Sequence, residues 1–253
     1  PFSQTVNVGA TYAPTARGTP PATKTVTTTN YWGGTQTTTY QLTNCVSERT
    51  GTSAYIDAPP ETSAFVGAVY TSNGSCLPSQ TIVPLSSDAA ALKSAIDSYE
   101  ASGSTAGHLG TAWAWYVLSP RWSTVWPAAS RPGAYDQITT MNRFGNPRLR
   151  KIAVLMTDGE YNIQYCDGLS TSSTSCATGL GSSTTQATQL CNGIKASGIT
   201  VFTVGFQVSS ASRDFLRTCA SGEGNYYDAT DGAALNQAFT DIALKISSLY
   251  LTQ

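Results

Sequence analysis

Residues 151–162, with the sequence KIAVLMTDGEYN, constrain the fold more than any other stretch of the chain. They contain a compact apolar run, 152–157, that is too short for an ordinary helix and ends at the turn dipeptide Asp158-Gly159. Such a run predicts a strand buried on both faces, inside a parallel sheet covered by helices. Asp158 would then stand at the carboxyl end of a central strand, where open α/β sheets bind ligands. The dipeptide is equally ordinary turn chemistry, so a ligand role and a turn role both remain open.

Helix and strand patterns alternate from Ser86 to the end of the chain. Capping residues and apolar stripes predict helices over 86–101, 107–118, 184–197 and 232–251, with a short helix around Phe215 and Leu216. Apolar β-branched runs and a small aromatic segment predict strands over 151–157, 199–206 and 226–229. This alternation predicts an α/β fold with a doubly wound, mostly parallel sheet.

Residues 9–85 lack helical periodicity. Two strand-like segments, 24–32 and 35–43, flank Gly33-Gly34 and predict a hairpin. Turn residues dominate the segment that follows. We therefore expect 9–85 to be a long, irregular, β-rich insertion within a single domain that spans 1–253.

Charge and cysteine content narrow the class of protein. Only 11% of the 253 residues are charged and the net charge is −1, which leaves no basic patch for nucleic acid. The six cysteines form no CxxC pair and the chain has one histidine, so disulfides are favoured over zinc and indicate a location outside the cytoplasm. The longest apolar stretches are far shorter than a membrane span requires.

No catalytic constellation is evident. The single histidine, His108, stands in a Gly-rich turn entering a helix, where capping or packing is the expected role, and no GxSxG elbow or phosphate-binding loop is present. The acidic pairs Glu48/Asp57 and Asp228/Asp231 lie in turn-rich sequence and are expected to be solvated. The sequence therefore predicts a protein that is not an enzyme.

An oxygen-ligand metal site remains as the candidate chemistry. Thr105 precedes the predicted helix 107–118 and Asp158 ends the predicted central strand, so both are expected at the same edge of the sheet. A hydroxyl and a carboxylate suit Mg²⁺, which takes hard oxygen ligands and keeps several waters, although two such residues alone hold a divalent ion weakly.

Motifs along nearly the whole chain resemble a von Willebrand factor type A domain, and more narrowly the C-terminal part of TadG-like proteins of Tad/Flp pilus assembly in bacterial envelopes. The most distinctive pair is SGSTAGHLG at 102–110 with AVLMTDGEYN at 153–162. The other matching segments are PFSQTVNVG (1–9), CVSERTG (45–51), PLSSDAAALKSAID (84–97), LCNGIKASGITVFTVGF (190–206) and YYDATDGAALNQAF (226–239).

This resemblance implies a metal-ion-dependent adhesion site with Thr105 and Asp158 as ligands to Mg²⁺ or Ca²⁺. The family's first motif, Asp-x-Ser-x-Ser, is not found in the chain. By comparison with the family, the first strand and its helix lie upstream of residue 1. That upstream part is expected to carry a transmembrane anchor. It is expected either to stay associated with the chain as a separate fragment after cleavage or to belong to the native protein outside this chain.

The resulting hypothesis is an adhesion or pilus-assembly domain in the periplasm or at the cell surface, binding a protein partner of the cell envelope or pilus machinery. The alternative is a structural scaffold with a vestigial, metal-free site, contacting its neighbours through residues 9–85 and through the aromatic loop 119–149, including Trp122 and Trp126. The expected disulfides are Cys45–Cys76, Cys166–Cys176 and Cys191–Cys219.

Overall fold

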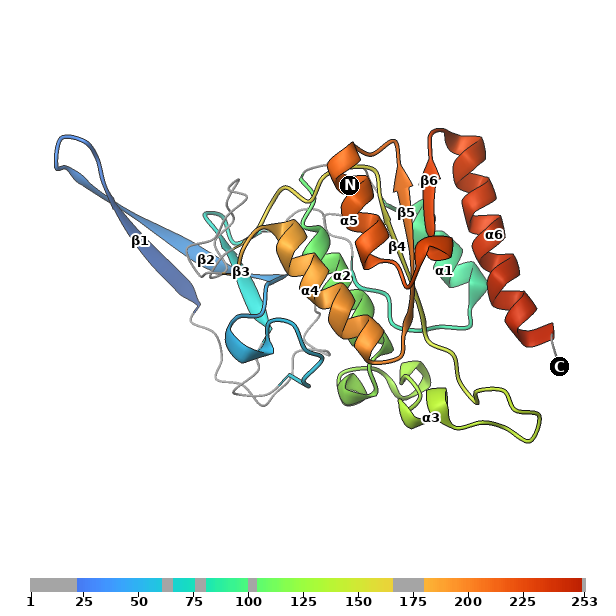
Figure 1. Ribbon diagram of the computed structural model, residues 1–253. Coiled ribbons are helices and arrows are strands. Elements are labelled where there is room, and N and C mark those ends of the chain that lie inside the picture. The colour runs from blue at the N-terminus through green and yellow to red at the C-terminus, as the bar shows by residue number, and fades with distance from the viewer. Residues whose placement is uncertain (1–21, 61–65, 76–80, 100–103, 166–179, 252–253) are drawn as a thin grey trace.

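The computed structural model describes residues 22–60, 66–75, 81–99, 104–165 and 180–251 (Figure 1). Its strands are β1 (Thr23–Thr29), β2 (Thr35–Ser47), β3 (Gly67–Thr71), β4 (Ile152–Thr157), β5 (Thr200–Phe206) and β6 (Tyr226–Ala229). Its α-helices are α1 (Ala89–Asp97), α2 (Gly107–Leu118), α3 (Asp136–Thr139), α4 (Ser183–Ala196), α5 (Ser210–Cys219) and α6 (Gly232–Leu251). Short 3₁₀ turns lie at Gly51–Ser53, Pro120–Trp122, Ala128–Ser130 and Glu223–Asn225.

The predicted doubly wound sheet is wrong. The described strands form two separate sheets, an antiparallel one in the order β1-β2-β3 and a parallel one in the order β4-β5-β6. A doubly wound sheet requires the strand order to reverse at a switch point. Here the strands of the parallel sheet lie side by side in chain order, β4, β5, β6, so the strand order does not reverse. Within the described ranges, the only strand–helix–strand units are β4-α4-β5 and β5-α5-β6.

Most individual elements form where local pattern predicts them. Strands β1 and β2 form the predicted hairpin, with its turn at Gly33-Gly34. The helix expected at 107–118 is α2. Serine caps begin α4 and α5, because the side chain of Ser182 accepts a hydrogen bond from Thr185 N and that of Ser209 accepts one from Ser212 N. The long segment 9–85 is β-rich where it is described, and its status as an insertion within one domain stays a prediction.

Helices cover both faces of the parallel sheet (Figure 1). On one face, Ala153 and Leu155 of β4 pack into the main core with α2, α4 and α5. On the other face, Phe202 and Val204 of β5 pack against α6. No helix within the described ranges is both long enough and apolar enough to cross a bilayer.

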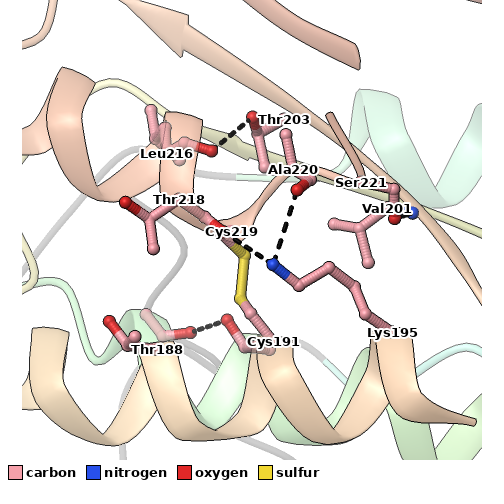
Figure 2. The surroundings of a disulfide bond; sticks show 12 residues. Thr188, Cys191, Lys195, Val201, Thr203, Leu216, Thr218, Cys219, Ala220 and Ser221 are labelled. Atoms are coloured by element: carbon pink, nitrogen blue, oxygen red, sulfur yellow. Dashed lines mark hydrogen bonds between the residues drawn. A yellow bond between two sulfur atoms is a disulfide. The ribbon is translucent and has the colours of Figure 1, made fainter. Parts of the chain in front are cut away.

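A disulfide joins α4 to the end of α5 (Figure 2). The Cα atoms of Cys191 and Cys219 are 5.2 Å apart, and this pairing is the one predicted. Nearby, Nζ of Lys195 donates to the carbonyl of Thr218 at 2.7 Å and so adds a second link between the same helices. Cys45 is also disulfide-bonded. The predicted pairs Cys45–Cys76 and Cys166–Cys176 both include residues outside the described ranges, so they stay predictions.

Candidate functional site

The loops that carry Thr105 and Asp158 are joined by two hydrogen bonds between Thr105 and Asn162, one between backbone groups and one to the Asn162 side chain. Asn162 N donates to the carbonyl of Thr105 at 3.0 Å, and Thr105 N donates to Oδ1 of Asn162 at 2.9 Å. Thr105 is buried, whereas Asp158 directly follows β4 and is exposed. The Thr105–Asn162 pair joins the loop before α2 to the loop after β4, and the convergence of Thr105 and Asp158 themselves stays a prediction.

A pocket of about 140 Å³ opens beside these loops. It lies where the carboxyl end of β4 meets the first turns of α4 and α5. Ser209, the N-cap of α5, donates a hydrogen bond to Oε1 of the lining residue Glu160 at 2.9 Å. Burial raises the pKa of another lining residue, Tyr161, to about 12. Its lining residues are Thr157, Gly159, Glu160, Tyr161, Thr184, Ala211, Ser212 and Phe215.

The donor atoms at this edge match a hard cation in type but not in number. Thr105 and Asp158 offer one hydroxyl and one carboxylate, whereas Mg²⁺ and Ca²⁺ take six or more oxygen ligands. Among the described residues no group of three or more His, Cys, Asp and Glu side chains is placed to hold a metal ion. These residues therefore fit at most a cation that keeps most of its water, and metal binding stays a prediction.

His108 lies at the centre of a buried polar group. Its Nδ1 is 2.6 Å from Oγ of Ser183 and its Nε2 is 2.6 Å from Oε1 of Glu48. Ser183 is 0% exposed and His108 is 1% exposed, so a substrate has no access to the hydroxyl. The group resembles a hydrolase triad in composition only. The expected packing role of His108 is confirmed.

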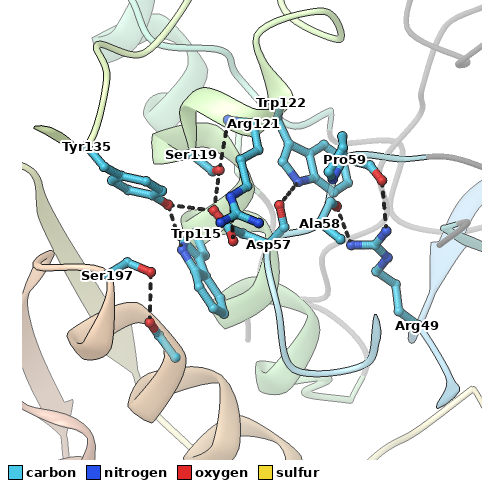
Figure 3. Close-up of polar contacts among 11 residues, drawn as sticks. Arg49, Asp57, Ala58, Pro59, Trp115, Ser119, Arg121, Trp122, Tyr135 and Ser197 are labelled. Carbon is cyan, nitrogen blue, oxygen red and sulfur yellow. Dashed lines mark hydrogen bonds and ion pairs between the residues drawn. The ribbon is translucent and has the colours of Figure 1, made fainter. Parts of the chain in front are cut away.

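The expectation that Glu48 and Asp57 are solvated is wrong, because both are buried. The carboxylate of Asp57 accepts hydrogen bonds from Ser119 Oγ at 2.5 Å and from Tyr135 OH at 2.7 Å (Figure 3). Trp122 Nε1 donates to the backbone carbonyl of Asp57 at 3.2 Å. These bonds attach the segment that follows β2 to the end of α2. Nothing in the local sequence around Asp57 indicates them, since its partners lie more than sixty residues away.

The two loop tryptophans expected to contact a partner are core residues instead. Trp122 and Trp126 are both buried and pack edge-on against Trp113. Trp122 also stacks on Tyr116, with ring centroids 4.1 Å apart. Loop 119–149 therefore contributes these aromatic rings to the interior and not to a binding surface.

The exposed aromatic residues lie at the tip of the β1–β2 hairpin. Tyr31 is 94% exposed and Trp32 is 88% exposed, and their rings meet edge-on at 5.4 Å. The side chain of Asn30 holds the turn, because its Oδ1 accepts from Trp32 N at 3.0 Å and from Gly34 N at 2.8 Å. Gly33 supplies the left-handed backbone conformation, with φ of 78°. This pair was not singled out from the sequence, in which it lies at the end of the predicted strand 24–32 beside the Gly33-Gly34 turn.

The hairpin extends away from the rest of the described chain (Figure 1). Seven cross-strand pairs connect β1 to β2, from Thr23–Gln41 to Thr29–Thr35, which at ~3.3 Å per residue gives a ribbon roughly 20 Å long. Thr27 and Thr37 are hydrogen-bonded through their hydroxyls at 3.1 Å. The ribbon therefore presents its two aromatic rings at a distance from the core.

Comparison with known proteins gives no assignment. No protein-family model and no curated protein matches the chain. One solved structure, the pilus adhesin SpaC from Lactobacillus rhamnosus GG, is similar over 76% of this chain, with 15% sequence identity and a TM-score of 0.42. The chain spans 24% of that adhesin. A likeness of this size supports no conclusion about fold or function.

Proposed function

We propose that the chain is a non-enzymatic adhesion or binding domain that works outside the cytoplasm and holds its partner with the tip of the β1–β2 hairpin. The observation that carries this proposal is the near-complete exposure of Tyr31 and Trp32 on a turn that Asn30 holds in place. Tryptophan and tyrosine are the side chains most enriched among residues that dominate binding energy. A tip already ordered before binding loses little conformational freedom in the complex.

The hairpin's lack of charge indicates the kind of contact. No charged side chain occurs between Thr25 and Thr39, so the tip cannot attract a partner by long-range electrostatics. We expect burial of the two rings in an apolar or amphipathic recess of the partner to supply the affinity, and we expect that affinity to change little with salt.

The disulfides support a location outside the cytoplasm. The bond between Cys191 and Cys219, and the disulfide that includes Cys45, would be reduced in an ordinary cytosol. This location suits adhesion and also suits a role in assembling a pilus or another envelope structure.

The test compares the wild-type chain with the double variant Tyr31→Ser/Trp32→Ser. Fluorescently labelled protein is added to isolated cell envelopes of the producing organism, and the retained fraction is measured over a range of concentrations. We expect at least about a tenfold loss of apparent affinity in the double variant. Phe144→Ser is the matched control, because Phe144 is an exposed aromatic side chain in a different loop. Equal retention of the double variant and the wild type would refute the tip as the binding element.

Metal-dependent binding at the edge of the parallel sheet is a second candidate. It is favoured by the hydrogen bonds that join the loop of Thr105 to the loop after Asp158. On this hypothesis a chelator, or Asp158→Ala, abolishes retention on the same envelopes, and calorimetric titration with Mg²⁺ or Ca²⁺ gives a heat of binding that the variant loses. Unchanged retention in both tests would remove the metal mechanism and leave the hairpin proposal intact. A scaffold function would remain if the hairpin variant also bound normally.

A further inference from the structure

One face of the β1–β2 hairpin is a ladder of threonine side chains. Alternate residues of a strand point to the same face, so the threonines of three directly opposed cross-strand pairs share that face. One pair is joined through its hydroxyls, since Oγ1 of Thr27 lies 3.1 Å from Oγ1 of Thr37. All six of these threonines are exposed. The pairs, which we call the threonine face, are Thr25–Thr39, Thr27–Thr37 and Thr29–Thr35.

The threonine face repeats along the hairpin and ends at the exposed rings. Successive pairs are two residues apart, which at ~3.3 Å per residue places two hydroxyls at every ~7 Å of the ribbon. Each of these hydroxyls can both donate and accept hydrogen bonds. The loop that carries Tyr31 and Trp32 follows directly after the last pair, Thr29–Thr35. The hairpin therefore combines a repeating row of neutral hydroxyls with two aromatic rings at one end.

The composition of the hairpin favours one class of ligand over the others. The lack of charge between Thr25 and Thr39 leaves nothing in this stretch to attract nucleic acid or anionic lipid headgroups. Its one aliphatic hydrocarbon side chain, Val26, pairs with Thr38 and so lies on the opposite face. The threonine face is therefore too polar to enter the hydrocarbon of a membrane.

A neutral sugar polymer is complementary to both parts of this surface. Its hydroxyls can exchange hydrogen bonds with the threonine hydroxyls, which are neutral and act both as donors and as acceptors. The C–H faces of its rings are apolar and can pack on aromatic rings. Its repeating units also match a surface on which the same side chain recurs at a fixed interval.

We propose that the threonine face and the tip of the hairpin together bind a neutral polysaccharide. This inference rests on the proposed function, because it names the partner that the same hairpin tip holds. Tyr31 and Trp32 pack on the C–H faces of one part of the polymer. The threonine hydroxyls form hydrogen bonds with the sugar units that lie further along the ribbon.

Competition against isolated cell envelopes of the producing organism tests the class of ligand. A second portion of envelopes is digested with protease and separated into lipid, acidic polysaccharide and neutral polysaccharide. Each fraction is then added to intact envelopes that retain the fluorescently labelled wild-type chain. We expect the neutral polysaccharide alone to release the chain. Release by the lipid or the acidic fraction in its place, or release by none of the three, would overturn the proposal.

Valine substitutions test whether the threonine face takes part. Thr27→Val/Thr37→Val removes two hydroxyls but keeps the branched shape that suits a strand, and we expect it to weaken retention by about tenfold. Thr28→Val/Thr38→Val is the matched control, because it removes two hydroxyls from the opposite face of the same hairpin. It should bind as the wild type does. Circular dichroism verifies that each variant is folded.

The outcomes separate this inference from the proposed function. Equal retention of the two valine variants would overturn the threonine face as a binding surface. If Tyr31→Ser/Trp32→Ser still lost its affinity in that case, the aromatic tip would stand as the binding element without the polysaccharide. Normal retention of Tyr31→Ser/Trp32→Ser would overturn both.

Discussion

Nε2 of His108 lies 2.6 Å from Oε1 of Glu48, and this contact joins the first turn of α2 to the segment that follows β2. Glu48 Oε1 also accepts a hydrogen bond from Tyr165 N at 2.8 Å. The other carboxylate oxygen, Oε2, is buried and has no hydrogen-bond partner among the described residues. Glu48 therefore gains all of its described hydrogen bonds through one oxygen, and these bonds tie together three parts of the chain.

Removing this carboxylate should destabilise the protein substantially. Glu48→Ala leaves the buried His108 without its acidic partner and the half-buried Tyr165 N without this acceptor. We expect the free energy of unfolding, measured by urea denaturation, to fall by about 2–4 kcal/mol. Asp97→Ala is the control, because Asp97 forms an exposed ion pair with Lys93 and its loss should change stability by less than about 0.5 kcal/mol. Similar losses in the two variants would contradict a structural role for Glu48.

The Cys191–Cys219 disulfide should contribute a measurable share of the stability. Its two cysteines are 28 residues apart in sequence, and the chain-entropy model assigns a loop of this size about 3.5 kcal/mol. We expect the double variant Cys191→Ala/Cys219→Ala to unfold at a lower urea concentration by a corresponding amount. Because Cys45 forms a separate disulfide, both proteins are compared under non-reducing conditions, and a variant as stable as the wild type would contradict the prediction.

Close packing of α2 against α4 requires a glycine at position 193. A Cβ atom there would overlap the ring of Trp115 and lie 3.1 Å from the carbonyl of Tyr55. Alanine is favoured over glycine inside a helix by about 1 kcal/mol, but overpacking costs about 1–3 kcal/mol. We expect Gly193→Ala to be net destabilising in thermal unfolding. Gly232→Ala at the start of α6, where no atom lies within 4 Å of the added Cβ, should be neutral or stabilising.

Local pattern was sufficient to predict most elements but not their assembly. The apolar spacing of residues 232–251 requires only neighbours one turn away, and α6 forms with those bounds. The number of strands in the parallel sheet depends on which strand segments pair, and helix–strand alternation does not contain that information. The prediction of a doubly wound sheet failed for this reason.

The buried polar residues were missed for a related reason. Glu48 bonds to residues 60 and 117 positions away, and Asp57 to residues 62 and 78 positions away. A carboxylate in turn-rich sequence is solvated unless distant donors cover it, and those donors are defined only by the tertiary fold. The exposed rings of Tyr31 and Trp32 were not predicted either, although a short hairpin loop has no room to bury two large rings.

Lys151 and Tyr135 should give the stability a distinctive dependence on pH. Burial lowers the pKa of Lys151 to about 8, while Nζ donates to Leu118 O at 2.6 Å. Burial raises the pKa of Tyr135 to about 12, and its bond to Asp57 acts in the same direction. Between pH 8 and about 10 the unfolded chain binds more protons at Lys151 than the folded chain, so stability should rise with pH.

Above about pH 10 the folded chain retains the Tyr135 proton that the unfolded chain loses, so the contribution of Tyr135 to stability should fall as pH rises. Urea midpoints measured from pH 7 to 11 test both effects. Lys151→Met should remove the rise and Tyr135→Phe should reduce the fall, each without altering the other. A midpoint that decreases steadily from pH 8, or a rise that persists in Lys151→Met, would show that Lys151 is not the group responsible.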